Sequence, residues 1–93
     1  MEFKKEQTEE KIIFYIEEDG KRIGEIVNQL RGTDRIIIEH TEVIAAEGRK
    51  GLGKKLVDQV VAYARENKLK IVPMCSFARS VFQRFRQDYE DVL

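Results

Sequence analysis

The 93-residue chain has few of the residues that mark several large classes of protein. It has one cysteine (Cys75), one histidine (His40), one proline and no tryptophan. A single cysteine excludes an intramolecular disulfide, and one cysteine with one histidine cannot supply the usual ligands of a zinc site, so we expect no metal. No apolar run approaches the ~20 residues that span a bilayer, and the start, MEFKKEQTEEK, lacks the apolar segment of a signal peptide. We therefore expect a cytoplasmic protein without a membrane partner.

Net charge is absent as well, because 17 Lys and Arg residues balance 17 Asp and Glu residues. A neutral chain is a poor candidate for a general nucleic-acid binder, which usually carries excess positive charge. The local distribution is uneven, since Arg49, Lys50, Lys54 and Lys55 lie close together with no acid among them. Such a cluster on a neutral protein favours a small anionic ligand over a long polyanion.

Hydrophobic periodicity predicts three antiparallel strands in the first half of the chain. Residues 11–17, KIIFYIE, are rich in β-branched and aromatic side chains, and the EDGK stretch that follows contains the Asp-Gly pair favoured in tight hairpins. Residues 22–30 form the expected return strand, and residues 35–44 the third. The first half therefore reads as an antiparallel meander.

The period then changes to that of an amphipathic helix over residues 52–67. A short buried strand is expected at 69–74, followed by a second helix that is capped by Ser76 and ends near residue 87, with a frayed C-terminus. Arg79, Arg84 and Arg86 are expected on the solvent side of this helix. The prediction is one α/β (α+β) domain, residues 1–93, with a mixed, mainly antiparallel sheet and two helices.

The stretch EGRKGLGKKLV has the composition of a phosphate-binding loop, and the first candidate is a P-loop. Gly48, Gly53 and Lys54 match the G-x-x-x-x-G-K spacing. The next position should be Ser or Thr, whose hydroxyl binds magnesium, but it is Lys55. A cation where a metal ligand belongs disfavours this interpretation.

Two other phosphate-binding designs use glycines at this spacing. A dinucleotide-binding fingerprint begins with Gly51 and Gly53 but needs a third glycine where the chain has Leu56. The pyrophosphate loop of an acetyl-CoA-dependent transferase needs only backbone amides at a helix start, together with the helix dipole. The same letters also suit a plain turn followed by a solvated helix end, and spacing alone does not decide between that turn and a ligand site.

Three separated motifs in order, HTEV (40–43), GRKGLGKKLV (48–57) and LKIVPMCSFA (69–78), resemble the small single-domain members of the GNAT N-acetyltransferase superfamily. The resemblance covers about residues 10–90 and implies a truncated acyl-CoA N-acyltransferase fold. It also implies transfer of acetyl from acetyl-CoA to an amine of unknown identity. Gly51 and Gly53 match the glycines of the Gln/Arg-x-x-Gly-x-Gly/Ala signature, whereas Gly48 departs from its first position, where Arg49 could supply the missing cation. The residues implied to bind coenzyme A are Val43, Ile44, Gly48, Arg49, Lys50, Gly51, Leu52, Gly53, Lys54, Lys55, Ser76 and Phe77.

Cys75 is the first candidate for the chemistry. It follows an apolar strand and precedes the expected Ser76 cap, so the helix dipole would favour the thiolate, as a nucleophile or as an acid toward the leaving sulfur. A lone cysteine at such a place is also a common core residue, but the resemblance implies that the Cys-Ser-Phe element faces the acetyl group.

His40 is the second candidate, as a general base for the incoming amine. Strand alternation places it on the face of Ile36 and Ile38, which predicts partial burial, and places Glu39 on the other face. A non-catalytic CoA-binding or interaction module is the alternative to an enzyme.

Overall fold

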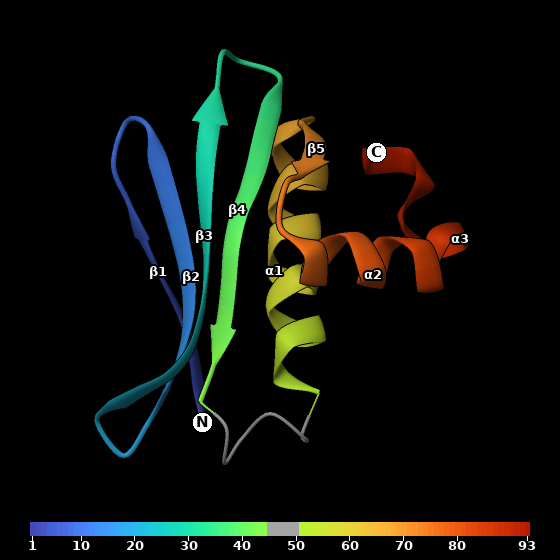
Figure 1. Ribbon diagram of the computed structural model, residues 1–93. Helices are drawn as coiled ribbons and strands as arrows, with labels where there is room; N and C mark the ends of the chain where they lie inside the picture. The colour runs from blue at the N-terminus through green and yellow to red at the C-terminus, as the bar shows by residue number, and fades with distance from the viewer. Residues whose placement is uncertain (45–50) are drawn as a thin grey trace.

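The computed structural model describes residues 1–44 and 51–93, which form a five-stranded sheet and three α-helices. The strands lie in the order β1-β2-β3-β4-β5; the first four are antiparallel and β5 runs parallel to β4 (Figure 1). The mixed, mainly antiparallel sheet is confirmed. The bounds are β1 Glu2–Gln7, β2 Lys11–Glu18, β3 Lys21–Arg31, β4 Arg35–Val43, α1 Leu52–Asn67, β5 Lys70–Pro73, α2 Ser76–Arg84, α3 Arg86–Tyr89 and a final 3-10 turn, η2, Glu90–Val92.

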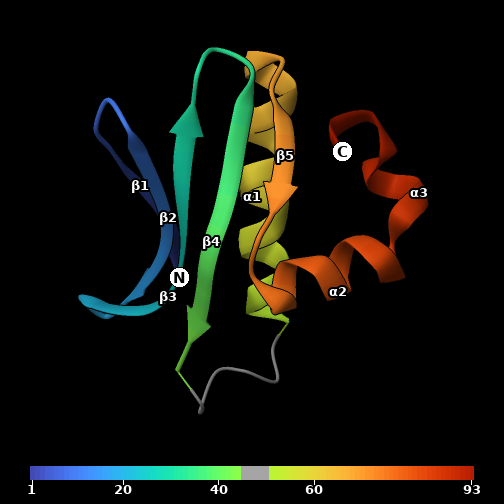
Figure 2. The same cartoon turned by 45° about the horizontal axis from the view of Figure 1, so that its top comes forward.

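Helix α1 covers one face of the sheet and builds the core. Its apolar stripe is buried as the 3.6-residue period predicted. The remaining helices lie beside β5, far from β1, as Figures 1 and 2 show. The opposite side of the sheet, called the open face below, has no helix from the described residues packed on it. The α1 residues in the core are Leu52, Leu56, Val57, Val60, Val61 and Ala64, and the sheet residues beneath them include Ile12, Phe14, Ile16, Ile26, Ile36 and Ile38.

Strand β1 was not predicted. Its sequence, EFKKEQ, has a single large apolar side chain, Phe3, and no alternation of apolar and polar residues. It is held by backbone pairing to β2 over its full length. Charged residues on an edge strand disfavour pairing with other chains. The polar sequence that prevented the prediction of β1 is therefore typical of a strand at the edge of a sheet.

The C-terminal end was wrongly expected to fray, and the second helix ends earlier than predicted. Helix α2 stops at Arg84 because Phe85 leaves helical geometry (φ −118°, ψ 38°). The chain then turns back onto α1, where Tyr89 and Val92 are 3% and 2% exposed. Arg65 of α1 holds this segment through two hydrogen bonds to Asp91, at 2.8 and 3.0 Å.

We expect Val92→Ala to lower the free energy of unfolding by about 1–3 kcal/mol, because it empties a buried site. Leu93→Ala is the control, since Leu93 is 40% exposed and surface changes usually cost within about 0.5 kcal/mol. Urea denaturation of both variants measures the difference. Equal stabilities would show that the C-terminal segment is not part of the cooperative core.

Strand β4 contains a bulge at Glu39 that changes which side chains face α1. Val27 of β3 pairs with His40, and the next β3 residue pairs with Ile38, so Glu39 is an extra residue in β4. A bulge interrupts the two-residue alternation of a strand. Thr41 therefore shares the α1 face with Ile38, and His40 lies on the open face, with its side chain 56% exposed. The expected partial burial of His40 beside Ile38 is wrong for this reason.

None of the helices that the structure describes is both long enough and apolar enough to cross a membrane.

Candidate functional site

A groove of about 500 Å³ lies between the start of α1, the end of β4 and one side of α2. Its walls are mainly apolar, and Lys54 and Arg84 bring positive charge to it. Two hydroxyls, from Thr41 and Ser80, also line it. The lining residues are Thr41, Val43, Gly51, Gly53, Lys54, Phe77, Ser80, Val81, Arg84 and Phe85.

The start of α1 presents backbone donors to this groove. Gly51 is the N-cap, in the left-handed region (φ 70°), and as a glycine it has no side chain to cap the helix. The first helical bond runs from the amide of Lys55 to the carbonyl of Gly51, at 3.2 Å, so the amides of residues 52–54 have no partner within the helix. The first turn also has no acidic residue. Donors and helix dipole together favour an anion here.

Gly53 lies against the Phe77 ring. A Cβ atom built on it would lie 2.5 Å from that ring, so a side chain here would force the ring to turn away from α1. Phe77 is 42% exposed and forms part of the groove wall. The ring and the glycine backbone together define the groove's width at the helix start.

Strand β4 continues past the end of β5, which opens a fork beside the groove. The two strands pair only from Arg35 to Ile38, and the last bond joins the Met74 amide to the Ile38 carbonyl at 2.9 Å. Beyond this point, no described strand pairs with the outer edge of β4 at Glu39–Val43. Peptide groups on that edge are placed to bond an extended ligand.

Cys75 lies where the fork opens and caps α2. Its Sγ accepts a hydrogen bond from the Ala78 amide and lies 3.4 Å from Thr41 Oγ1. The cap of α2 is therefore Cys75. The sequence had predicted Ser76, which is instead the first helical residue. The thiol is half-buried against the core. Since Thr41 lines the groove, Cys75 stands directly behind its wall.

Lys54 is held by the C-terminal segment. Its Nζ donates to Asp58 Oδ2 at 3.1 Å, and the Tyr89 hydroxyl donates to Asp58 Oδ1 at 2.5 Å. Hydrogen bonds to Tyr89 and Asp58 raise the pKa of the Lys54 ammonium. Burial, then the bond to Asp58, raises the pKa of the Tyr89 phenol. At neutral pH the cluster therefore contains a charged lysine and a neutral, donating tyrosine.

The groove collects part of the site that the sequence predicted. Val43, Gly51, Gly53, Lys54 and Phe77 line it. Gly48, Arg49 and Lys50 lie outside the described residues.

Four other expected binding residues do not line the groove. Leu52 is fully buried in the core, so only its backbone can meet a ligand. Ile44 is 48% exposed but lies in a small hollow next to Gly24, and its amide bonds the Ile23 carbonyl. Lys55 and Ser76 are exposed away from the lining.

Five lining residues were not predicted: Thr41, Ser80, Val81, Arg84 and Phe85. Arg84 was assigned to the solvent side of its helix, and the structure places it at the groove. A signal was available in the spacing of Phe77, Val81 and Arg84, which recur at four and three residues and so share one face of α2.

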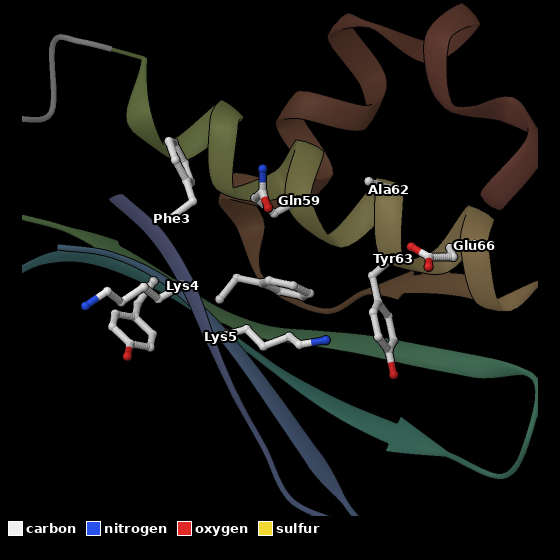
Figure 3. A pocket seen from close by; sticks show the side chains of 9 residues that line it. Phe3, Lys4, Lys5, Gln59, Ala62, Tyr63 and Glu66 are labelled. Atoms are coloured by element: carbon white, nitrogen blue, oxygen red, sulfur yellow. The ribbon is translucent and has the colours of Figure 1, made fainter. Parts of the chain in front are cut away.

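A second hollow, of about 570 Å³, lies between β1, β2 and α1 (Figure 3). Phe3, Lys5 and Tyr63 frame it, and the Lys5 ammonium lies 5.6 Å from the Tyr63 ring centroid. This hollow is larger than the groove, but its lining residues include no helix start, no glycine and none of the predicted site residues. The groove is therefore the better candidate for an anionic ligand.

Among residues 1–44 and 51–93, no three His, Cys, Asp or Glu side chains gather where they could hold a metal ion.

Comparison with known proteins agrees with this geometry. The sequence model of a family described as GCN5-related N-acetyl-transferase matches residues 13–92. The solution structure of a GCN5-like protein from Staphylococcus aureus, assigned as a candidate N-acetyltransferase, is 39% identical, with a TM-score of 0.72, over 96% of this chain and 85% of that one. A search of curated proteins gave no match.

More distant structures share the fold alone. The ribosomal-protein-S18-alanine N-acetyltransferase from Escherichia coli has a TM-score of 0.71 at 17% identity, over 84% of this chain and 53% of that one. A predicted acetyltransferase from Clostridium acetobutylicum, solved with acetyl-CoA, has a TM-score of 0.67 at 15% identity, over 81% of this chain and 56% of that one. This chain thus spans little more than half the length of these two proteins.

Proposed function

The chain belongs to the GCN5-related N-acetyl-transferase family, and on that premise we propose that it binds acetyl-CoA in the groove and transfers the acetyl group to an amine. The observation that carries the proposal is the start of α1 at Gly51, which opens onto a groove with Lys54 and Arg84 at its walls and with Cys75 nearby. These features supply donors for phosphate, an apolar channel and a thiol.

Three parts of acetyl-CoA have a matching feature at the groove. The pyrophosphate is expected at the amides of residues 52–54, where dipole and donors favour an anion. The pantetheine arm carries two amides, and the outer edge of β4 beyond Ile38 offers peptide groups to them. This arrangement directs the thioester toward Thr41 and Cys75, which are in contact with each other.

In the reaction, the amine nitrogen attacks the thioester carbon, a C–N bond forms and the C–S bond breaks. The amine loses a proton and the CoA sulfur leaves as thiolate or thiol. Cys75 has two possible roles. As an acid it gives its proton to the leaving sulfur; as a nucleophile it first takes the acetyl group on Sγ and then yields it to the amine.

His40 remains a proposed base, but it would act from the open face of the sheet and not, as the sequence indicated, from the face of Ile36 and Ile38. It lies on the open face, and Cys75 contacts the α1-facing residue Thr41. An amine that approaches the thioester from the open face through the fork would pass His40. His40 Nε2 is also 3.9 Å from Glu42 Oε2.

We expect CoA and acetyl-CoA to raise the melting temperature, while ATP with magnesium has no effect. At about 100-fold over its dissociation constant, a ligand adds about 2.7 kcal/mol of stability. The difference between ligands follows from Lys55, which occupies the position of the magnesium-binding hydroxyl in a P-loop. Differential scanning fluorimetry is the measurement, and a shift with magnesium-ATP but none with CoA would contradict the proposal.

A second candidate is a CoA-binding module without transfer activity. It is favoured by the lining of the groove, which includes neither Cys75 nor His40. A ligand held by the lining residues need not meet either candidate catalytic residue. Release of free CoA in the presence of a panel of amines and lysine peptides supports the enzyme; binding without release supports the module.

A further inference from the structure

Lys54 occupies a position that helix stability does not explain. It lies in the first turn of α1, where the helix dipole disfavours a cation. Its pairing with Asp58 runs from lysine to acid along the chain, the less favourable order for an i,i+4 pair. A cation kept at an electrostatic cost, on the wall of the groove, indicates a role toward the ligand.

The ammonium is nevertheless fixed in place. It lies 4.8 Å from the Phe85 ring centroid and 5.7 Å from that of Tyr89, and it donates to Asp58. The lysine side chain is 38% exposed, so part of it still faces the groove. A lysine held before the ligand arrives loses less conformational freedom on binding.

The fixed point of this arrangement is Tyr89, 31 residues from Asp58 along the chain. Asp58 is 43% exposed and would not be rigid alone. Tyr89 is 3% exposed, and its ring packs edge-to-face on Phe82 at 5.1 Å. Its hydroxyl therefore has a defined position. By donating to the Asp58 carboxylate it fixes that group, and the carboxylate in turn holds the Lys54 ammonium.

We propose that Tyr89 and Asp58 are positioning residues that hold the Lys54 ammonium toward the phosphates of CoA, so that docking of the C-terminal segment is coupled to ligand binding. This inference rests on the proposed function. By linkage, the coupling is reciprocal, and bound CoA must stabilise the docked C-terminal segment to the same degree.

The test is Tyr89→Phe, which removes one oxygen and keeps the ring that packs on Phe82. We expect CoA affinity to fall about five- to tenfold, near the low end of measured coupling between sites. The dependence of log Kd on log salt should become shallower, because a charge contact with phosphate is weakened. S-acetylpantetheine, which carries no phosphate, should bind the variant and the parent equally.

Tyr63→Phe is the matched control. Its hydroxyl also has a side-chain partner, Gln7 Nε2 at 3.2 Å, and its ring also packs edge-on against a phenylalanine, Phe14. It lies at the hollow on the other side of α1, so CoA affinity and salt slope should stay at parent values.

A double-mutant cycle closes the test. Once Lys54→Met is in place, adding Tyr89→Phe should not change CoA affinity further, since the two residues act through one contact. Additive losses, an unchanged salt slope, or an equal loss for S-acetylpantetheine would overturn the inference and leave Tyr89 a structural residue. A parent protein that fails to bind CoA would instead overturn the proposed function, so the two failures are distinguishable.

Discussion

Gly51→Val is expected to weaken CoA binding by about 100-fold. This figure corresponds to the loss of two hydrogen bonds between helix amides and a charged phosphate, at about 1.5 kcal/mol each. Gly51 caps α1 with φ 70°, and a Cβ atom there would meet no atom of the described residues within 4 Å. Because Gly51 lines the groove, we expect a valine side chain there to obstruct the approach of a phosphate to the helix amides. Isothermal titration with CoA measures the effect.

Gly20→Val controls for backbone strain. Gly20 has φ 76° and also has nothing within 4 Å of a built Cβ. It lies in the Asp19-Gly20 turn, where both residues have positive φ as the predicted tight hairpin requires. Both valines should cost about 1–2 kcal/mol of stability, but only Gly51→Val should lose CoA. Equal CoA affinity in the two variants would mean that the start of α1 is only a turn.

Cys75→Ser is expected to reduce acetyl transfer by at least about 100-fold while CoA affinity is retained, if the thiol is acid or nucleophile. The substitution keeps the cap, because a serine hydroxyl at this position can also accept the Ala78 amide. It leaves the lining of the groove unchanged, since Cys75 stands behind Thr41. Steady-state turnover and CoA titration on the same variant separate chemistry from binding.

Cys75→Ala extends this test to the structural role. It removes thiol and cap together, so it should lose about 1 kcal/mol of stability that Cys75→Ser keeps. In the parent, iodoacetamide should alkylate Cys75, and CoA should slow the reaction by covering the fork. Full activity in Cys75→Ser, together with a parent thiol whose alkylation rate CoA does not change, would make Cys75 a cap and core residue. His40 would then remain as the candidate catalytic residue.

Local patterns predicted those parts of the fold that depend on local physics. The stripe from Leu52 to Ala64 is buried because a helix repeats its face every 3.6 residues, whatever it packs on. Strand β1 was not predicted because its stability comes from pairing with β2, and the sequence of β1 alone carries no sign of that pairing. The docked C-terminus is similar, because the burial of Tyr89 and Val92 depends on a turn at Phe85 that returns the chain to α1.

The candidate site shows the same division between local and distant information. Gly51, Gly53 and Lys54 could be predicted from their spacing, and they line the groove. His40 was assigned to the wrong face, and Thr41 was not recognised as a groove residue, because the assignment assumed unbroken alternation along β4. The extra residue at Glu39 is visible only against the partner strand β3, so one strand read alone could not reveal it.

The bulge at Glu39 has a consequence for how access to the thioester could be altered. Because Glu39 is the extra residue, its deletion would leave Thr41 and Val43 on the α1 face and His40 on the open face, with every present pairing to β3 intact. What would change is the path of β4, since a bulge bends its strand and increases the local twist. A straighter β4 would diverge from β5 at a different angle and so change the fork between them. An insertion or deletion at this one position could therefore change which amines reach the acetyl group while every groove residue stays the same.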